Sequence, residues 1–252
     1  MAKGVVYRVV LCMALMGLSL QASTLLVGDP PVLGTGNCDP FGCPAFFGLG
    51  TFQEVYSSSA FTTGGITGEV AISALTFIDF QVHNGGVPAG GTFTLTLSYT
   101  SDAPGSLNLT NPNNNITPGT SQTFFSGLLP NPLPQTGGQV LNIPGTPFDY
   151  NPADGNLLLT VTMTGASNGA PPIFLDQSEC GPTTTTCPTG STVTTGTAYF
   201  PTTGSGGGND IGGLITQFTY TNPLATPEPG SLLLVVAGIG LIGYSRLRRR
   251  TT

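Results

Sequence analysis

The 252-residue chain has no tryptophan, a single histidine and only six lysines and arginines. None of these basic residues lies between positions 9 and 245, whereas all twelve aspartates and glutamates do. Such a stretch offers no positive surface to the phosphates of a nucleic acid or to anionic lipid headgroups. It also lacks a cation that could hold the phosphate or carboxylate group of a substrate. We therefore expect no nucleic-acid partner.

Common catalytic patterns are equally scarce. The chain has no H-E-x-x-H motif, and its G-x-S-x-G match at residues 165–169 is not followed by the helical pattern that a nucleophile elbow requires. Its one histidine, His83, precedes Asn84-Gly85-Gly86 and is typical of a turn residue rather than a catalytic base. The remaining catalytic option is a pair of carboxylates, as in a polysaccharide hydrolase. The candidates for such a pair are Asp79, Asp149, Asp154, Asp176 and Glu179. The sequence brings no two of them together, so we expect no enzymatic activity and no cofactor, with a hydrolase as an alternative.

A metal site has only weak candidates. Asp149, Asn151 and Asp154, followed by Gly155, could supply oxygen ligands to calcium, but their spacing does not fit an EF-hand. The same residue types are typical of a turn in which Asp and Asn side chains bond to their own backbone. We favour the turn and expect no bound metal.

The N-terminus has the layout of a secretory signal peptide. Lys3 and Arg8 precede a 12-residue apolar segment, Val9 to Leu20, and the small residues Ala22 and Ser23 follow it. A permanent anchor is disfavoured because this segment is too short to cross a bilayer well. We predict a signal peptide over residues 1–22.

The C-terminus holds four of the six basic residues behind an apolar run. Pro227-Glu228-Pro229 comes first, a short transmembrane helix is predicted over 231–245, and a basic cluster ends the chain. The cluster consists of Arg246, Arg248, Arg249 and Arg250, which we expect on the cytoplasmic side of the inner membrane. Its apolar run of about 13 residues makes about 20 Å of helix, less than the ~30 Å hydrocarbon core. The tail is therefore a marginal anchor, with an ordinary permanent tail anchor as the alternative.

These three elements, in this order at the chain end, resemble the PEP-CTERM sorting signal of exopolysaccharide-producing Gram-negative bacteria. The resemblance covers residues 226–250, with Thr226 standing where many relatives have valine. It implies an exosortase as partner, which cuts near the Pro-Glu-Pro and passes the protein from a transient inner-membrane anchor to the cell surface or the medium. It also implies that Pro227, Glu228 and Pro229 are the recognition residues.

The body, residues 23–225, has strand signals throughout. Apolar and polar residues alternate in 92–99 and 157–164, and 69–82 changes phase near Ala74 and Leu75, which predicts a bulge. Shorter strands are predicted at 52–56, 105–110, 172–176, 197–200 and 214–220, and loops at 127–139 and 181–210. Many short strands separated by turn residues predict an all-β fold of the β-sandwich or jelly-roll type.

Four cysteines remain after removal of the signal peptide, namely Cys38, Cys43, Cys180 and Cys187. An exported protein favours disulfides, and three pairings are open. We prefer Cys38–Cys43 and Cys180–Cys187 because each closes a short loop containing glycine or proline. A zinc site is disfavoured because the spacings lack C-x2-C pairs.

Parts of the body, including 146–161 and 173–176, also resemble an uncharacterised group of exported PEP-CTERM proteins. That resemblance implies a β-sandwich and a surface destination but no activity, and Thr160 departs from the acidic residue that relatives often have there. We therefore expect a non-enzymatic surface or extracellular-matrix protein associated with exopolysaccharide. The alternative is a glycan-binding or adhesive module, which the lack of tryptophan makes less favoured.

Overall fold

Alternating apolar and polar residues build the long strands of the body. In the computed structural model, the described residues are 22–28, 36–46, 48–79, 86–135, 138–178, 194–202, 209–210 and 212–222. Ala22–Thr221 forms one compact unit. The predicted signal peptide up to residue 21, the C-terminal tail, His83, Glu179, Cys180 and Cys187 lie outside the described residues.

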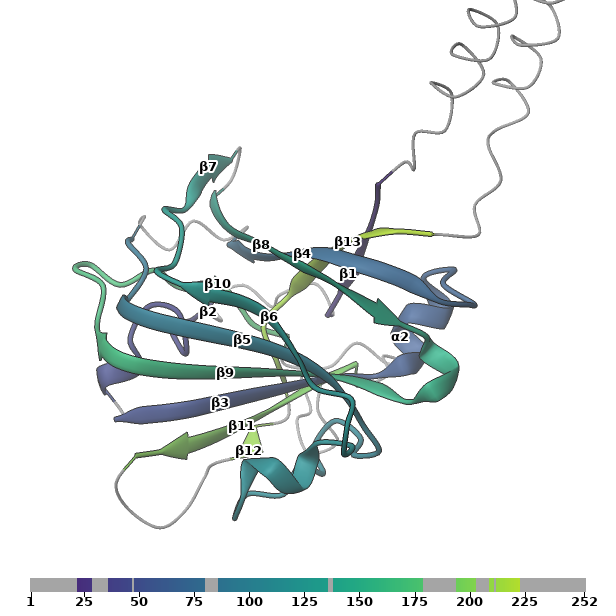
Figure 1. The fold of residues 1–252 in the computed structure, drawn as a ribbon. Helices are drawn as coiled ribbons and strands as arrows, with labels where there is room; N and C mark the ends of the chain where they lie inside the picture. The colour runs from purple at the N-terminus through teal and green to yellow at the C-terminus, as the bar shows by residue number, and fades with distance from the viewer. Residues whose placement is uncertain are drawn as a thin grey trace, which may run out of the picture. The chain divides into compact units, whose positions relative to one another are not determined.

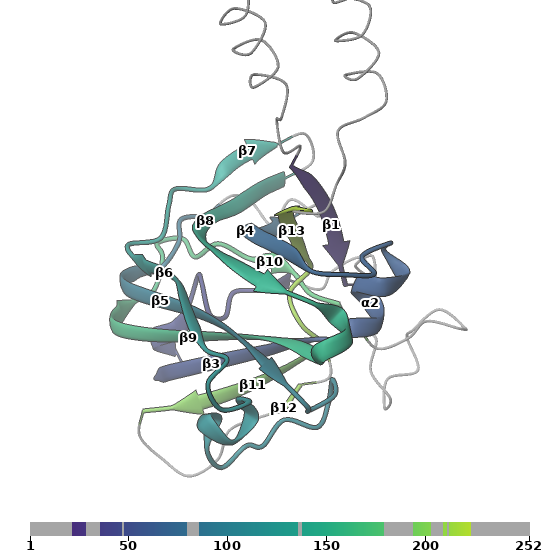
Figure 2. The ribbon, with the colours of Figure 1, turned by 45° about the vertical axis from the view of Figure 1, so that its right-hand side comes forward.

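One sheet contains both ends of the body. Its five strands follow the order β1 (Ser23–Val27), β13 (Thr216–Thr221), β4 (Val70–Asp79), β8 (Gly138–Tyr150) and β7 (Leu133–Gln135). Every neighbouring pair in this sheet is antiparallel. The first and last strands of the body therefore pair with each other, as Figures 1 and 2 show.

The second sheet has six strands and is also antiparallel. Its order is β12 (Asn209–Asp210), β11 (Thr195–Pro201), β3 (Leu49–Tyr56), β9 (Asn156–Ser167), β5 (Gly90–Thr100) and β6 (Gln122–Gly127). A two-stranded ribbon pairs β2 (Gly36–Asn37) with β10 (Leu175–Asp176).

The two sheets enclose one hydrophobic core (Figure 1). Leu75 and Phe77 of β4 are fully buried on one side, and Leu95 of β5 and Val161 of β9 are fully buried on the other. Because alternate residues of a strand point to opposite faces, the threonines between these apolar residues lie on the outer face of the sheet. The predicted all-β class is confirmed, and the alternation in 92–99 and 157–164 gives β5 and β9.

A single short helix, α2 (Ser58–Thr63), is described in the body. Ser57 caps its N-terminus by accepting a hydrogen bond from the Ser59 amide, as capping serines do. The helix buries Phe61, whose ring centroid lies 4.7 Å from that of Tyr150 and 5.1 Å from that of Phe218. These edge-on aromatic contacts close the core at the end nearest α2.

Several local predictions are confirmed and others are wrong. The bulge in β4 is confirmed, because the register shifts between Ile72 and Ala74. The predicted strand 105–110 is wrong: this segment is a turn-rich loop that leads into η2 (Pro112–Asn115). The Asn108 side chain accepts bonds from the Thr110 and Asn111 amides, which removes the donors that a ladder would use. The predicted strand 172–176 shrinks to Leu175–Asp176, and the predicted loop 127–139 contains β7.

Candidate functional site

A disulfide closes the loop that follows β2. Cys38 and Cys43 are bonded, with their Cα atoms 5.3 Å apart, as predicted. The loop inserts Phe41 into the core, where its ring centroid lies 4.6 Å from that of Phe77. This anchoring indicates a structural role, and the second predicted pair, Cys180–Cys187, lies outside the described residues.

The same loop contains Asp39, which forms with Cys38 and Cys43 a group whose potential ligand atoms lie within 4.8 Å of one another. One carboxylate oxygen of Asp39 lies 3.4 Å from the Cys43 sulfur. Burial raises the pKa of Asp39 to about 6. Metal-binding thiolates must be free and deprotonated, and here both sulfurs are joined to each other. The arrangement therefore fits a structural loop rather than a metal centre.

The weak calcium candidates sit in a turn. The Asn151 side chain accepts a hydrogen bond from the Ala153 amide and caps η3 (Pro152–Asp154). The Tyr99 hydroxyl accepts a 2.7 Å bond from the Asn151 amide. Both aspartates, Asp149 and Asp154, are exposed. The oxygen of Asn151 is thus used by the backbone, as the turn interpretation predicts.

The candidate hydrolytic carboxylates are not gathered at a common opening in the described part of the chain. Asp79 and Asp176 are buried, whereas Asp149 and Asp154 are exposed in the η3 turn. Two open grooves lined by described residues have no carboxylate in their lining.

One buried acid was not singled out by the sequence. Glu54 of β3 is fully buried and points into the main core, between the core residues Phe52 and Tyr56 of the same strand. Neither of its carboxylate oxygens makes a well-formed hydrogen bond. Burial raises the pKa of Glu54 well above its usual range, an effect larger than the lowering by the nearby Leu214 backbone and the Tyr56 hydroxyl. Burial therefore favours the protonated, uncharged form of Glu54.

The backbone around Glu54 fits closely against its carboxyl group. A Cβ atom at Gly213 would clash with a carboxylate oxygen of Glu54, so a larger residue there would force the Glu54 side chain to move. The Gly213 amide donates to the Thr195 hydroxyl at 2.9 Å, and the Tyr56 and Thr216 hydroxyls lie 3.0 Å apart. These contacts enclose Glu54 completely, so it is a core residue without access to a substrate.

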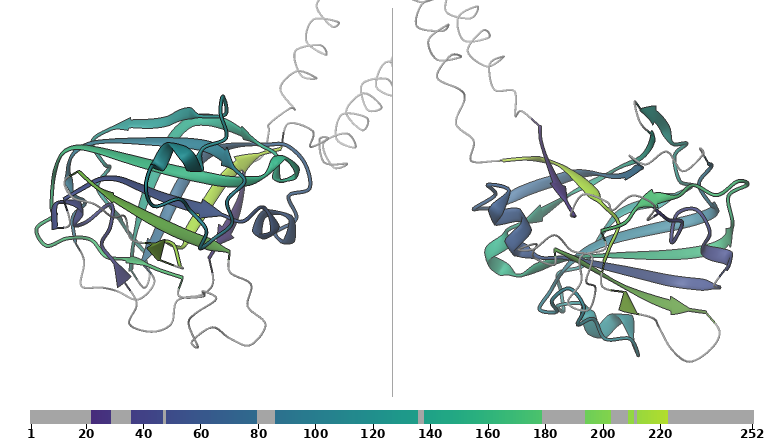
Figure 3. Two further views of the ribbon diagram at one scale, coloured as in Figure 1. Left: turned by 90° about the horizontal axis from the view of Figure 1, so that it is seen from below. Right: turned by 180° about the vertical axis from the view of Figure 1, so that it is seen from behind.

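On the opposite side of β3, a polar network holds a loop over part of the six-stranded sheet. The Gln53 side-chain amide donates to the Pro112 carbonyl and to the Thr160 hydroxyl, both at 3.0 Å. Its oxygen accepts a 2.7 Å bond from the Asn115 side chain, which also bonds to the Asn108 backbone. Beneath this loop a small apolar cluster buries Val55, Leu107, Leu158, Ala198 and Phe200. The view from below shows the loop and η2, in teal, crossing the sheet (Figure 3, left).

The uncovered part of this outer surface is an array of hydroxyl groups. We call it the threonine face, and it consists of Thr51, Thr92, Thr94, Thr96, Thr123, Ser126, Thr162 and Thr164. The register places one row across four strands, in the order Thr51, Thr162, Thr94 and Ser126. A second row continues from Gln53 and Thr160 to Thr96 and Thr123. Such rows arise because threonines occupy every second position of adjacent strands, and the register of these strands places the threonines opposite one another.

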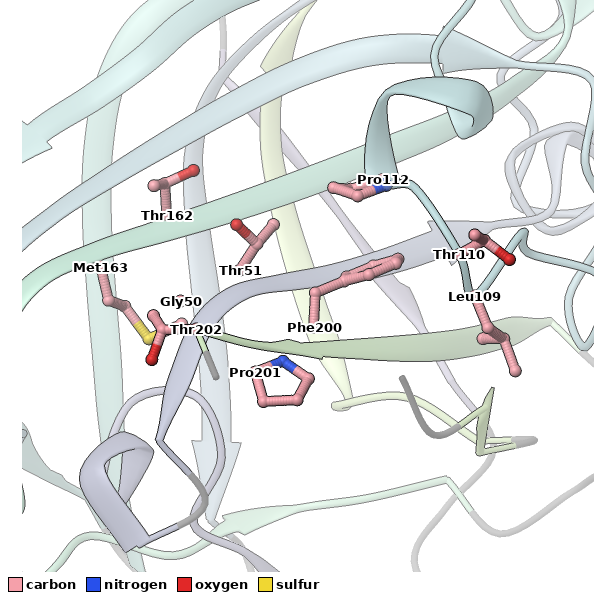
Figure 4. Close-up of a pocket in the computed structure, with 10 residues that line it drawn as sticks. All are labelled: Gly50, Thr51, Leu109, Thr110, Pro112, Thr162, Met163, Phe200, Pro201 and Thr202. Carbon is pink, nitrogen blue, oxygen red and sulfur yellow. The ribbon is translucent and has the colours of Figure 1, made fainter. Parts of the chain in front are cut away.

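The threonine face continues into an open groove of about 460 Å³ (Figure 4). Thr51 and Thr162 lie along one edge, and Phe200, Pro201 and Leu109 supply apolar surface on the other. A second groove of about 390 Å³ lies between β1 and α2 and is lined by Leu25, Leu26 and Ala60 among others. Neither groove has a charged residue in its lining.

The comparisons with known proteins concern the tail. Residues 225–250 match the family model of the PEP-CTERM protein-sorting motif. No curated protein and no solved structure matches the chain. Among the described residues, no helix has the length and apolarity needed to cross a membrane, and the helix predicted over 231–245 lies outside them. The motif match confirms the predicted PEP-CTERM tail, which supports an exported protein processed by an exosortase.

Proposed function

We propose that this chain is a non-enzymatic protein of the cell surface or extracellular matrix, released there by an exosortase and associated with exopolysaccharide. The single observation that carries this proposal is the PEP-CTERM motif at 225–250, directly behind a compact all-β body. In this proposal the signal peptide of residues 1–22 is removed on export. The helix over 231–245 then holds the protein in the inner membrane until the exosortase cuts near Pro227–Pro229.

The properties of the body support an extracellular role. Its disulfide between Cys38 and Cys43 suits an oxidising compartment outside the cytoplasm. Between residues 9 and 245 the chain has acidic but no basic residues, so the body repels anionic polymers and stays soluble. The second disulfide, Cys180–Cys187, belongs to the same proposal.

The proposal of a non-enzymatic role rests on how the carboxylates are distributed. Glu54, Asp79 and Asp176 are buried, and the two grooves contain no acidic residue in their lining. A hydrolase would need two carboxyl groups facing each other across a substrate-binding cleft. We therefore favour association with polysaccharide over its hydrolysis.

The experiment is a fractionation of producing cells into membranes, extracellular polysaccharide and free medium. We expect the wild-type chain in the polysaccharide fraction. A triple variant, Pro227→Ala, Glu228→Ala and Pro229→Ala, should remain in the membranes. The matched control is Pro223→Ala, which removes a proline just outside the matched segment and should behave as the wild type.

Two results would contradict the proposal. If the triple variant reached the polysaccharide as efficiently as the wild type, the sorting role of the Pro-Glu-Pro would be wrong. If the wild-type protein were found only as a soluble species in the medium, association with exopolysaccharide would be wrong.

A further inference from the structure

We propose that the threonine face binds an uncharged, hydroxyl-rich polysaccharide chain laid across strands β3, β9, β5 and β6. This inference rests on the proposed association with exopolysaccharide and names the surface responsible for it. The observation behind it is the row of hydroxyls from Thr51 through Thr162 and Thr94 to Ser126, which crosses four neighbouring strands in register.

The chemistry of the face matches that of a neutral sugar polymer. Each threonine hydroxyl both donates and accepts hydrogen bonds, as sugar hydroxyls do. Each threonine methyl offers apolar surface to the C–H groups of a sugar ring. Opposite residues on adjacent strands have Cβ atoms about 4.5–5.5 Å apart, and alternate residues of one strand are about 6.6–6.8 Å apart. A repeating polymer can therefore engage several positions of the face at once, which raises its overall affinity.

The face is organised before any ligand arrives. Threonine is β-branched and has few side-chain rotamers, so little conformational entropy is lost when it binds. The Thr94 and Ser126 hydroxyls already lie 3.2 Å apart. Where the loop covers the same outer surface, the Gln53 side chain donates to the hydroxyl of Thr160 at 3.0 Å, which fixes the end of the second row. A ligand can reach this surface, because five of its residues are exposed to solvent, namely Thr92, Thr123, Ser126, Thr162 and Thr164.

The distribution of charge selects a neutral ligand. None of the acidic residues in the described ranges occupies an outward position on β3, β5, β6 or β9. The only acid within these strands, Glu54, points into the core. A cationic partner therefore finds no counter-charge on this face, and the net charge of −6 repels an anionic polymer. An uncharged polyhydroxylated chain is the partner that remains.

The adjoining groove extends the contact. Thr51 and Thr162 belong to both the threonine face and the groove, so a chain following the row runs directly into it (Figure 4). There Pro201 and Leu109 offer apolar surface beside the hydroxyls. Sugar-binding sites commonly combine apolar contacts with a few polar groups that fix orientation.

The test is affinity electrophoresis of the full chain in mild detergent, with hydroxyethylcellulose in the gel as the neutral probe. Carboxymethylcellulose has the same backbone with added carboxylates and serves as the anionic probe. We expect hydroxyethylcellulose to retard the wild-type protein and carboxymethylcellulose to retard it much less. The double variant Thr94→Val and Thr162→Val removes two hydroxyls but keeps the β-branched shape. It should lower the affinity for hydroxyethylcellulose at least about tenfold.

The matched control is Thr219→Val with Thr221→Val, which removes two hydroxyls from β13 of the other sheet and should bind as the wild type does. A third variant, Thr162→Asp, adds a negative charge to the face and should also lose affinity, with circular dichroism confirming that it is folded. Equal retardation of the face variant and the β13 control would overturn the inference, as would a wild type that the neutral probe does not retard. If light scattering showed that the face variant splits a dimer, the face would be an interface between two copies, and the inference would again be wrong.

The cell fractionation separates this inference from the proposed function. If the Thr94→Val and Thr162→Val variant stays with the extracellular polysaccharide as the wild type does, the threonine face is not the binding surface and the proposed function stands. If the wild-type protein is itself absent from that fraction, the proposed function fails.

Discussion

Ser23 and Tyr220 lie directly opposite each other in the antiparallel pair β1–β13. The first residue after the predicted signal peptide thus pairs with a residue seven positions before Pro227. A segment of seven residues spans at most about 25 Å. The predicted signal peptide and the sorting tail are therefore joined to the body at neighbouring points of one sheet.

This arrangement makes the last strand essential to the fold. β13 lies between β1 and β4, so the five-stranded sheet is incomplete until the residues just before the sorting tail have been added. Phe218 of β13 is fully buried and its ring packs edge-on against those of Tyr56 and Phe61. The body can thus complete its folding only when the chain has been made up to Thr221, the end of β13.

Phe218→Ala should lower the free energy of unfolding by about 3–5 kcal/mol, because it leaves a cavity beside the rings of Tyr56 and Phe61. Chemical denaturation followed by circular dichroism measures this change. Leu128→Ala is the control, since Leu128 is 74% exposed, and it should change the stability by less than about 0.5 kcal/mol. Equal effects of the two substitutions would contradict the packing described for β13.

Glu54→Gln should stabilise the protein at pH 7 and above. Burial raises the pKa of the Glu54 carboxyl group in the folded state, so folding takes up a proton at pH values between its usual pKa and the raised one. The contribution of Glu54 to the free energy of unfolding is most favourable at acid pH. Above the usual pKa of glutamate it falls by about 1.4 kcal/mol per pH unit, until the raised pKa of the folded state is reached. Glutamine has nearly the same shape and does not titrate, so the advantage of the variant should grow with pH above about 4.5.

The measurement is the unfolding free energy of both proteins from pH 4 to pH 8. Asp39 has its pKa raised to about 6 and adds a slope of the same sign between about pH 4 and 6 in both proteins. Their difference therefore isolates Glu54. A difference that stays constant across this range would show that Glu54 is ionised in the folded protein.

Asn115→Leu should destabilise the loop that covers one end of the six-stranded sheet. Asn115 is 1% exposed, and its side chain bonds to Gln53 and to both backbone groups of Asn108. Leucine leaves these buried partners without bonds, at a cost of about 1–3 kcal/mol for each unsatisfied group. Amide hydrogen exchange should rise selectively around residues 105–117, whereas Asn113→Ala, at an exposed position, should leave it unchanged.

The sequence predicted the regular parts of this fold and missed parts that depend on distant contacts. β5 and β9 follow from strict alternation, and the bulge in β4 follows from its change of phase. β8 was not predicted, because Pro144, Gly145 and Pro147 interrupt its pattern, yet β4 pairs along most of its length. The segment 105–110 reads as a strand by alternation alone, but the side chain of Asn108 gives its backbone different partners.

The candidate sites show a similar division. The disulfide between Cys38 and Cys43 follows from their short spacing, and the PEP-CTERM tail follows from a local motif. The burial of Glu54 depends on the close approach of Gly213, which is 159 positions away in the sequence. No local sequence pattern predicts this burial. Part of the threonine face could be predicted, because alternation in 92–99 and 157–164 predicts outward threonines on what are β5 and β9, whereas β6 was not predicted. Their alignment into rows depends on the register of β3, β9, β5 and β6, which only the folded chain supplies.

The measurement that tests the central claim most directly is the intact mass of the protein from whole cells and from the extracellular fraction. The account predicts an extracellular species that lacks residues 1–22 and the residues beyond about Pro229, with two hydrogens fewer for each disulfide. A full-length tail, found only in membranes, would contradict it and would identify a permanently anchored protein.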